Sequence, residues 1–189
     1  MAKRDPHVAA ARIVRDAGGQ IIGRTRLQKI AYLLQLAGFG DEFHFDYKHY
    51  GPFSDDLAKG IEIASAFGQI QEEEHRASWG GWYSIYRLPV PLPPEDPSRA
   101  EFVSWANAIG AVELELAATA AFLYQVEGVG RTNAGNPWME TRARKPEKSQ
   151  GGRLENAAAE YAKLRLNGVA ATLPDLSQFS ATPVAASAA

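Results

Sequence analysis

Apolar side chains recur with a helical period along the first forty residues. Residues 6 to 17 begin with Pro6 and end at two glycines, so they predict a short amphipathic helix. A second predicted helix runs to Gly38, with apolar positions at i, i+3, i+4 and i+7: Leu27, Ile30, Ala31 and Leu34. Thr25 and Gln28 have the spacing of a capping box, which predicts the start of this helix. Its solvent-facing side is expected to be basic.

The period then changes to strict alternation in "FHFDYKHY", residues 43 to 50, which predicts a half-buried strand. Gly51 and Pro52 are expected to turn the chain from this strand into a third helix, residues 54 to 67. Ser54 is a favourable N-cap, and Asp55 and Asp56 lie in the first turn, where the helix dipole favours carboxylates. Residues 69 to 88 predict a hairpin that turns near Ser78 to Gly81.

The second half of the chain is predicted to be helical. A proline-rich spacer, residues 89 to 97, precedes helices over 97 to 109 and 111 to 127, and another helix runs from about 154 to 166. The predicted fold is α+β and mostly helical. It has a winged-helix-like core with a small antiparallel sheet over residues 1–90, and a helical extension over 91–168 with a basic loop at 128–152. Residues 169–189 are expected to form a disordered, low-complexity tail.

Composition fits one globular protein without disulfides. The chain has 189 residues, 46% hydrophobic and 22% charged, and no cysteine, which excludes thiolate metal sites and cysteine nucleophiles. No apolar run is long enough to span a bilayer, and no exported leader is visible, so we expect a cytoplasmic protein that does not bind membranes. The net charge of −2 conceals an asymmetry: residues 1–40 carry +5, residues 41–127 carry −10 and residues 128–189 carry +3.

Signals for catalysis are weak. His44 and Asp46 lie two apart on one strand, but no further ligand pair completes a metal site, and a solvent-facing polar pair explains them better. The three glutamates at 72–74 fit a solvated strand edge better than a carboxylate pair, since consecutive strand residues point to opposite faces. "GVGRTNAG" lacks the GK[ST] ending of a phosphate-binding loop. We therefore expect no catalytic residue, metal or cofactor.

The order of elements resembles a winged helix, which makes DNA binding an alternative. The third helix and the hairpin are acidic, and phosphates would repel them. If DNA is bound, the candidate contacts are basic residues of the second helix and of the later loop: Arg24, Arg26, Lys29, Arg142, Arg144, Lys145 and Lys148. An ordinary solvated basic face is an equally good explanation of these residues.

Aromatic and acidic residues are the candidates for contact with a partner protein. Trp138 lies in a polar, basic segment, where it either anchors the segment on the core or contacts a partner. Tyr50 and Phe53 flank the glycine-proline corner, and Asp55 and Asp56 follow it.

Two sets of motifs resemble known families. "GRTRLQKIAYLLQ" followed by "FHFDYKHYGPFSDDLAKGI" resembles the LQK and YGP motifs of the YwgA-like proteins, which are described as transcriptional regulators, and of the Panacea domain of SocA-like antitoxins. "TNAGNPWMETR" resembles a later Panacea motif, with Asn133 where that family has histidine. The resemblance implies a non-enzymatic module that neutralises a protein toxin by direct binding, and in some members delivers a target to a protease.

We therefore expect an antitoxin-like protein-binding module, with a DNA-binding regulator as the alternative. The acidic middle of the chain suits a basic toxin, because complementary charge steers association. The terminal Ala188-Ala189 resembles a tag read by AAA+ proteases, although simple low complexity explains it as well.

Overall fold

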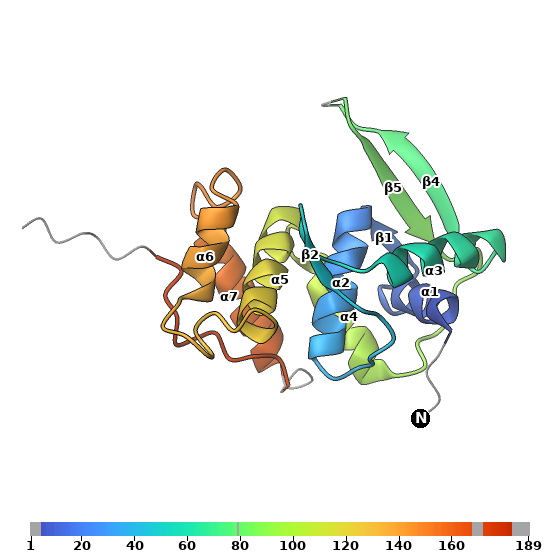
Figure 1. Cartoon of the computed structure of the whole chain (residues 1–189). Helices are drawn as coiled ribbons and strands as arrows, with labels where there is room; N and C mark the ends of the chain where they lie inside the picture. The colour runs from blue at the N-terminus through green and yellow to red at the C-terminus, as the bar shows by residue number, and fades with distance from the viewer. Residues whose placement is uncertain (1–4, 79, 168–171, 183–189) are drawn as a thin grey trace, which may run out of the picture.

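The computed structural model describes residues 5–78, 80–167 and 172–182. Within these residues the elements in chain order are α1 (Pro6–Asp16), β1 (Gln20–Ile22), α2 (Arg24–Leu36), β2 (Asp46–Lys48), β3 (Gly51–Phe53), α3 (Asp55–Ala66), β4 (Gln71–Arg76), β5 (Trp82–Arg87), α4 (Pro97–Ala108), α5 (Ala111–Gln125), α6 (Pro137–Arg144) and α7 (Arg153–Leu166). Figure 1 shows α1 and α3 at one end of the molecule, α6 and α7 at the other, and the β4–β5 hairpin projecting from the body. The fold is α+β, as predicted.

Side-chain caps set the start of three helices. The hydroxyl of Ser54 accepts from the N–H of Leu57 at 3.2 Å and begins α3, as predicted. Asp96 caps α4 and Asn136 caps α6 in the same manner. The predicted capping box at Thr25 is wrong: the N-cap of α2 is Gly23 at φ +103°, two residues before Thr25, and no side chain caps the helix.

The strands form two antiparallel sheets, of order β1-β5-β4 and β2-β3. The β4–β5 hairpin was predicted, but β1 was missed because it has only three residues. The predicted strand over 43–50 is too long: ladder pairing covers only Asp46–Lys48, although Phe43 and Phe45 are buried as expected. The chain reverses at residues 49–50, so Gly51 and Pro52 belong to β3 rather than to a corner leading into α3.

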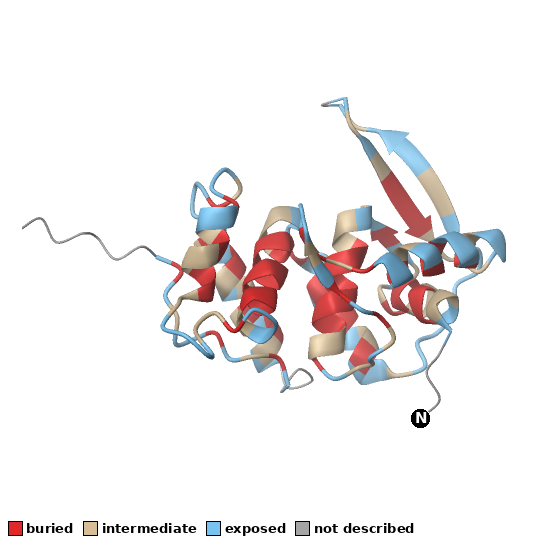
Figure 2. Ribbon diagram, in the orientation of Figure 1, coloured by how far each residue is buried: buried red, intermediate tan, exposed pale blue. Residues whose placement is uncertain are grey.

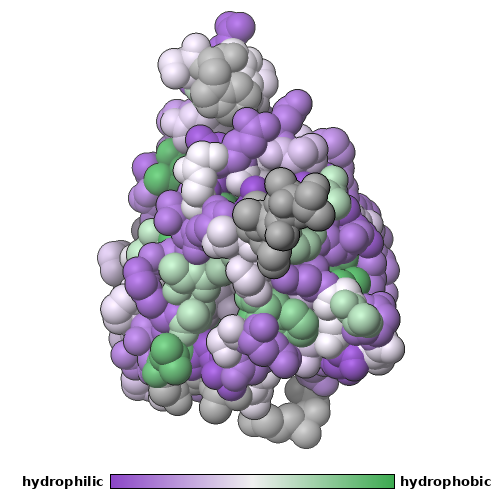
Figure 3. All heavy atoms as spheres, turned by 90° about the vertical axis from the view of Figure 1, so that its left-hand side faces the viewer, coloured by the Kyte–Doolittle hydropathy of each residue, from purple (hydrophilic) through white to green (hydrophobic). Residues whose placement is uncertain are grey.

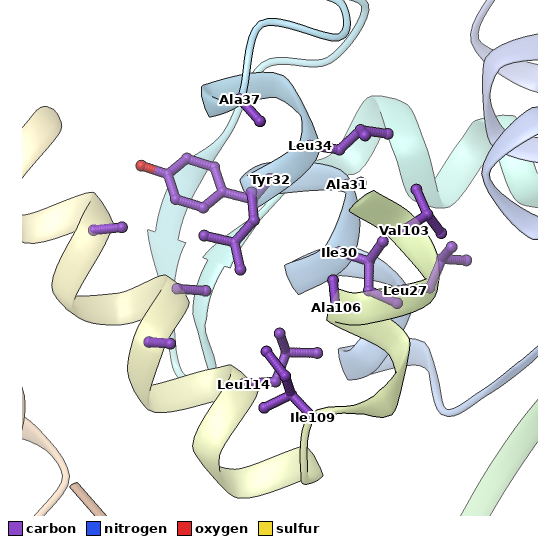
Figure 4. Packing of buried hydrophobic residues seen from close by; sticks show 14 of the residues in the cluster. Leu27, Ile30, Ala31, Tyr32, Leu34, Ala37, Val103, Ala106, Ile109 and Leu114 are labelled. Carbon is purple, nitrogen blue, oxygen red and sulfur yellow. The ribbon is translucent and has the colours of Figure 1, made fainter. Parts of the chain in front are cut away.

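The centre of the core lies where α2, α4 and α5 pack together (Figure 4). Leu27 and Ile30 of α2 meet Ala106 of α4 and Leu114 of α5, and all four are buried. Figure 2 shows buried residues running through α2 and α5, with exposed ones concentrated on the hairpin and the outer helices. Residues before and after the proline-rich spacer therefore share one hydrophobic cluster, which stabilises both parts together.

The C-terminal region is more ordered than predicted. The segment 128–152 is not all loop, because it contains α6. Part of the expected disordered tail packs on the protein: Leu173 and Leu176 are buried, and the Tyr161 hydroxyl donates to the carbonyl of Pro174 at 3.0 Å. Apolar residues inside a polar segment account for this difference, since they bury surface against α7. Residues 168–171 and 183–189, including the Ala188-Ala189 end, lie outside the described residues.

Candidate functional site

The two sequence motifs meet in the interior through hydrogen bonds from α2 to the chain around β3. The Gln28 amide donates to the carbonyl of Ser54 at 3.0 Å and accepts from its N–H at 2.8 Å. The Lys29 ammonium donates to the carbonyl of Pro52 at 2.6 Å. Both side chains are buried. LQK and YGP thus form one structural unit, in which long polar side chains satisfy the backbone of a very short strand.

Gly51 is required by the close approach of β3 to α5. Its φ of +83° is a left-handed conformation that disfavours other residues, and a Cβ there would lie 2.5 Å from Oγ1 of Thr119. Both effects exclude a side chain. The β2–β3 turn is consequently pressed against the middle of α5.

A buried cluster of charges lies under this turn. Glu115 of α5 accepts from Lys145 at 2.8 Å and from Lys148 at 2.7 Å, and Lys145 also donates to the carbonyl of His49 at 3.0 Å. Lys29 is the third ammonium near the carboxylate. Burial lowers the pKa of Lys29 to about 7; Glu115 opposes this change, while Lys145 and Lys148 add to it. Three lysine side chains therefore lie near one carboxylate, and burial leaves one of them, Lys29, only partly charged near neutral pH.

A groove of about 610 Å³ opens beside the cluster. It lies between the start of α2, the β4–β5 hairpin, the β2–β3 turn and the start of α5. Large apolar side chains on its walls are exposed: Trp82 by 67%, Tyr50 by 52% and Ile22 by 48%. Phe53, Tyr83 and Val112 extend this lining. The groove combines exposed aromatic residues with a charged floor, so it is the candidate binding site.

The groove brings together half of the residues proposed from the sequence. They are Tyr50 and Phe53 of the partner-contact group, and Arg24, Arg26, Lys29 and Lys148 of the basic group. Asp55 and Asp56 lie outside it, exposed on α3, where Asp55 pairs with Lys48 at 2.8 Å. The structure therefore separates the predicted aromatic contacts from the predicted acidic ones.

The prediction that α2 presents a basic face to solvent is wrong. Lys29 is only 1% exposed, and Arg26 donates from Nη1 to the carbonyls of Asn107 and Ile109, both at 2.7 Å. Arg24 is exposed, yet it binds Glu72 at 3.0 Å and Glu74 at 2.7 Å. Hydrophobic periodicity placed these residues correctly on α2 but could not reveal their distant partners.

The basic residues of segment 128–152 are also engaged within the protein. Arg144 binds both carboxylate oxygens of Glu127, at 2.8 and 2.6 Å, and Arg142 binds Glu155 at 2.8 Å. Lys145 and Lys148 hold Glu115. The acidic middle of the chain therefore supplies many of the carboxylates that pair with its two basic flanks, and charge that is segregated in sequence is largely paired in space.

Trp138 anchors α6 on the core. It is 1% exposed and meets the ring of Tyr161 edge-on, with centroids 6.1 Å apart. Of the two alternatives, anchoring fits this position. Trp138 is therefore not available for contact with a partner, because α6 turns the indole inward.

Sequence reasoning missed several residues of the groove, and Trp82 and Glu115 are the most important of them. Trp82 was placed in the hairpin, but nothing in its local pattern indicated that it would face the start of α5. Glu115 had a usable signal: it is the one charged residue between positions 114 and 123, a run that is otherwise apolar or uncharged and buried. A carboxylate in such a place requires a partner, and here it has two.

Other possible sites are less developed. In the described parts of the chain, no group of three or more His, Asp or Glu side chains could hold a metal ion. A smaller cavity of about 310 Å³ lies between α1 and residues 88–95, and none of the predicted site residues lines it. Among the described helices, none alone has the length and apolar character to cross a bilayer. Helices α4 and α5 meet these two criteria only when taken together, and they are bent by 118° at the break between them.

Comparison with known proteins identifies one related sequence. Over 81 residues the chain is 32% identical to the uncharacterized protein YwgA of Bacillus subtilis (strain 168). The chain is similar to YwgA. The matched stretch is 43% of this chain and 46% of YwgA, so the chain spans about half the length of that relative. No family model matches, and no solved structure matches significantly. The YwgA part of the resemblance is thus confirmed, while the Panacea part stays a prediction.

Proposed function

We propose that this protein is a non-enzymatic protein-binding module of antitoxin type, and that the groove holds its partner. The observation that carries the proposal is the exposure of Trp82 and Tyr50 on the walls of one groove. Tryptophan and tyrosine dominate the binding energy of protein interfaces, because they bury a large area at a low cost in conformational entropy. A pair of such residues beside a hollow supports binding of a protein segment.

Surface hydropathy marks no competing continuous patch at the α6–α7 end of the molecule. Figure 3 views this end, where hydrophobic residues lie in separate groups among hydrophilic ones. The proposed partner is a toxin encoded beside this protein in a cytoplasmic toxin–antitoxin pair. Delivery of that partner to an AAA+ protease is part of the same proposal.

Co-expression with the neighbouring reading frame tests this function. A frame that is lethal alone should be tolerated with the wild-type protein and should co-purify with it. Trp82→Ala and Tyr50→Ala should weaken both effects. Trp105→Ala is the matched control, because Trp105 is 49% exposed on α4 and lies outside the groove. Rescue that persists in Trp82→Ala would reject the groove as the binding site, and absence of any co-purifying partner would reject the function.

A DNA-binding regulator is the second candidate. It is favoured by the order of elements and by the β1-β5-β4 sheet with its projecting hairpin, an arrangement that resembles a winged helix. The face of α3 that would enter the major groove carries Asp55, Asp56 and Glu62 against Lys59. Salt-dependent retention of the protein on duplex DNA, weakened by Arg76→Glu in the hairpin, would favour this candidate over the first.

A further inference from the structure

We propose that the groove receives an acidic peptide segment, with a carboxylate beside the Lys148 ammonium and an apolar side chain on Trp82 and Tyr50. This inference rests on the proposed protein-binding function and names the chemistry of the bound segment. It differs from the expectation drawn from charge along the sequence, which favoured a basic partner. The occupant is thus identified by charge complementarity at the groove itself.

The lining of the groove has an excess of positive charge. Four basic side chains and two acidic ones line it: Arg24, Arg26, Lys29, Lys148, Glu74 and Glu115. The Arg24 end is balanced, because that guanidinium binds Glu74 and also Glu72. The excess therefore lies at the other end, near α5.

At that end the Glu115 carboxylate is shared by two ammonium groups, and a third lysine, Lys29, adds part of a charge near neutral pH. Glu115 is shared by Lys145 and Lys148, and Lys29 lies nearby with the carbonyl of Pro52 as its hydrogen-bond acceptor. Positive charge that is removed from water without a matching anion is costly, so an incoming carboxylate would be attracted to this place. Lys148 is the accessible member, with 35% of its side chain exposed, and the buried ammonium of Lys145 strengthens the local positive field.

Arg26 supplies further donors. Its Nη1 makes both bonds to the end of α4, while Nε and Nη2 have no hydrogen-bond partner among the described residues. Because Arg26 also lines the groove, an acidic segment could accept from it as well. A guanidinium that is fixed at one nitrogen presents the others with little loss of conformational freedom.

Aromatic surface lies directly beside this positive end. The Lys148 ammonium is 4.8 Å from the centroid of the Tyr50 ring, so one ligand residue could contact both. Trp82 faces them from the hairpin across the groove. An acidic residue next to a large apolar one matches this arrangement.

A single-stranded nucleic acid would also offer anions and stacking faces. It fits less well, because a phosphodiester backbone follows a continuous basic track and this groove is positive mainly at one end. Glu74 lies on the wall beside Trp82 and Tyr83, where successive phosphates would have to pass. The observations therefore favour a peptide.

A random peptide library displayed on phage, selected against the immobilised full chain, tests the inference. We expect enrichment of sequences with Asp or Glu beside an aromatic or large aliphatic residue. A selected peptide should then be synthesised with a fluorophore and its Kd measured by anisotropy. Replacing its acidic residues by Asn or Gln should weaken binding about tenfold, which corresponds to about 1.4 kcal/mol. Added salt should weaken binding in the same direction.

Matched variants separate the two components of the site. Lys148→Gln and Trp82→Ala should each weaken binding of the peptide about fivefold or more. Lys163→Gln and Trp105→Ala remove the same side-chain types outside the groove and should leave the Kd unchanged. Thermal melting of each variant shows whether a loss of binding reflects unfolding, and Tyr50→Ala provides a second groove variant if one of the others melts early.

Each alternative result has a distinct meaning. Selection of basic or uncharged apolar peptides that depend on Trp82 would overturn the acidic occupant but keep the protein-binding groove. Tight binding of a labelled oligo-dT that depends on Lys148 and Trp82 would overturn it in favour of nucleic acid. Failure to select any peptide dependent on Trp82 would also overturn it, while the co-expression experiment independently tests the proposed function.

Discussion

Lys29→Met is expected to change how the stability of this protein depends on pH. The Lys29 ammonium is buried beside Lys145, Lys148 and Glu115, and burial lowers its pKa from 10.5 to about 7. Methionine has a similar length and no charge, so it removes this titration while filling most of the same volume. The variant also leaves the carbonyl of Pro52 without its donor, a cost of about 1–3 kcal/mol that does not vary with pH.

The sign follows from the protons that each state binds. Because the pKa of Lys29 is lower in the folded state, the unfolded chain holds one more proton between pH 7 and pH 10.5. The stability of the wild type therefore rises with pH in this window, and below pH 7 the full penalty of about 5 kcal/mol applies. Between pH 6 and pH 9 linkage predicts a gain of about 2.7 kcal/mol for the wild type that the variant lacks.

Urea denaturation at pH 6, 7, 8 and 9 measures this effect as the difference between wild type and variant, which cancels groups common to both. Lys163→Met is the control, because Lys163 is exposed on α7 and should show a constant difference. A difference between wild type and Lys29→Met that stays flat from pH 6 to pH 9 would refute the reasoning. It would mean that the ammonium remains charged and compensated throughout.

Three further predictions concern stability. Gly51→Ala should lower the free energy of unfolding by about 1–2 kcal/mol for its backbone conformation and by about 1–3 kcal/mol more for a contact of 2.5 Å with α5. Gly80→Ala is the control, because Gly80 has φ +91° and open space around it and should show only the backbone cost. Equal losses of stability in urea denaturation would contradict the close contact at Gly51. Gln28→Ala should lower the free energy of unfolding by about 2–4 kcal/mol, because it leaves the buried N–H and carbonyl of Ser54 unpaired at the start of α3. A loss below about 1 kcal/mol would show that water replaces the amide. In the same assay Trp138→Ala should lower the free energy of unfolding by about 3–5 kcal/mol, and Trp82→Ala by less than about 0.5 kcal/mol. The reverse order would contradict the burial of Trp138 in the core and the exposure of Trp82 on the groove wall.

Local rules predicted most of the helices. Ser54 was recognised as a cap, and the amphipathic pattern located α1, α2 and α3 to within a residue or two. These features depend on side chains that interact with their own turn of the helix, so a short window of sequence contains the necessary information. The hairpin β4–β5 was found for the same reason.

The candidate site depends on contacts between distant residues and was predicted only in part. Tyr50 and Phe53 were recognised, but periodicity cannot tell whether a lysine such as Lys29 reaches solvent or a carbonyl 23 residues away. The placement of Trp82 opposite the start of α5 depends on how the hairpin packs against the body. That packing is a tertiary property, and no local pattern records it.

The bonds from Gln28 and Lys29 reach backbone atoms rather than side chains. The carbonyls of Pro52 and Ser54 would be available whatever residues stood at those two positions, provided that the chain kept its path. Selection on this contact therefore acts on α2 alone, and substitution at one end has no compensating substitution at the other. In an alignment of relatives, we expect Gln28 and Lys29 to be invariant without a covarying partner. A method that infers contacts from correlated mutation would miss the strongest link between the two motifs.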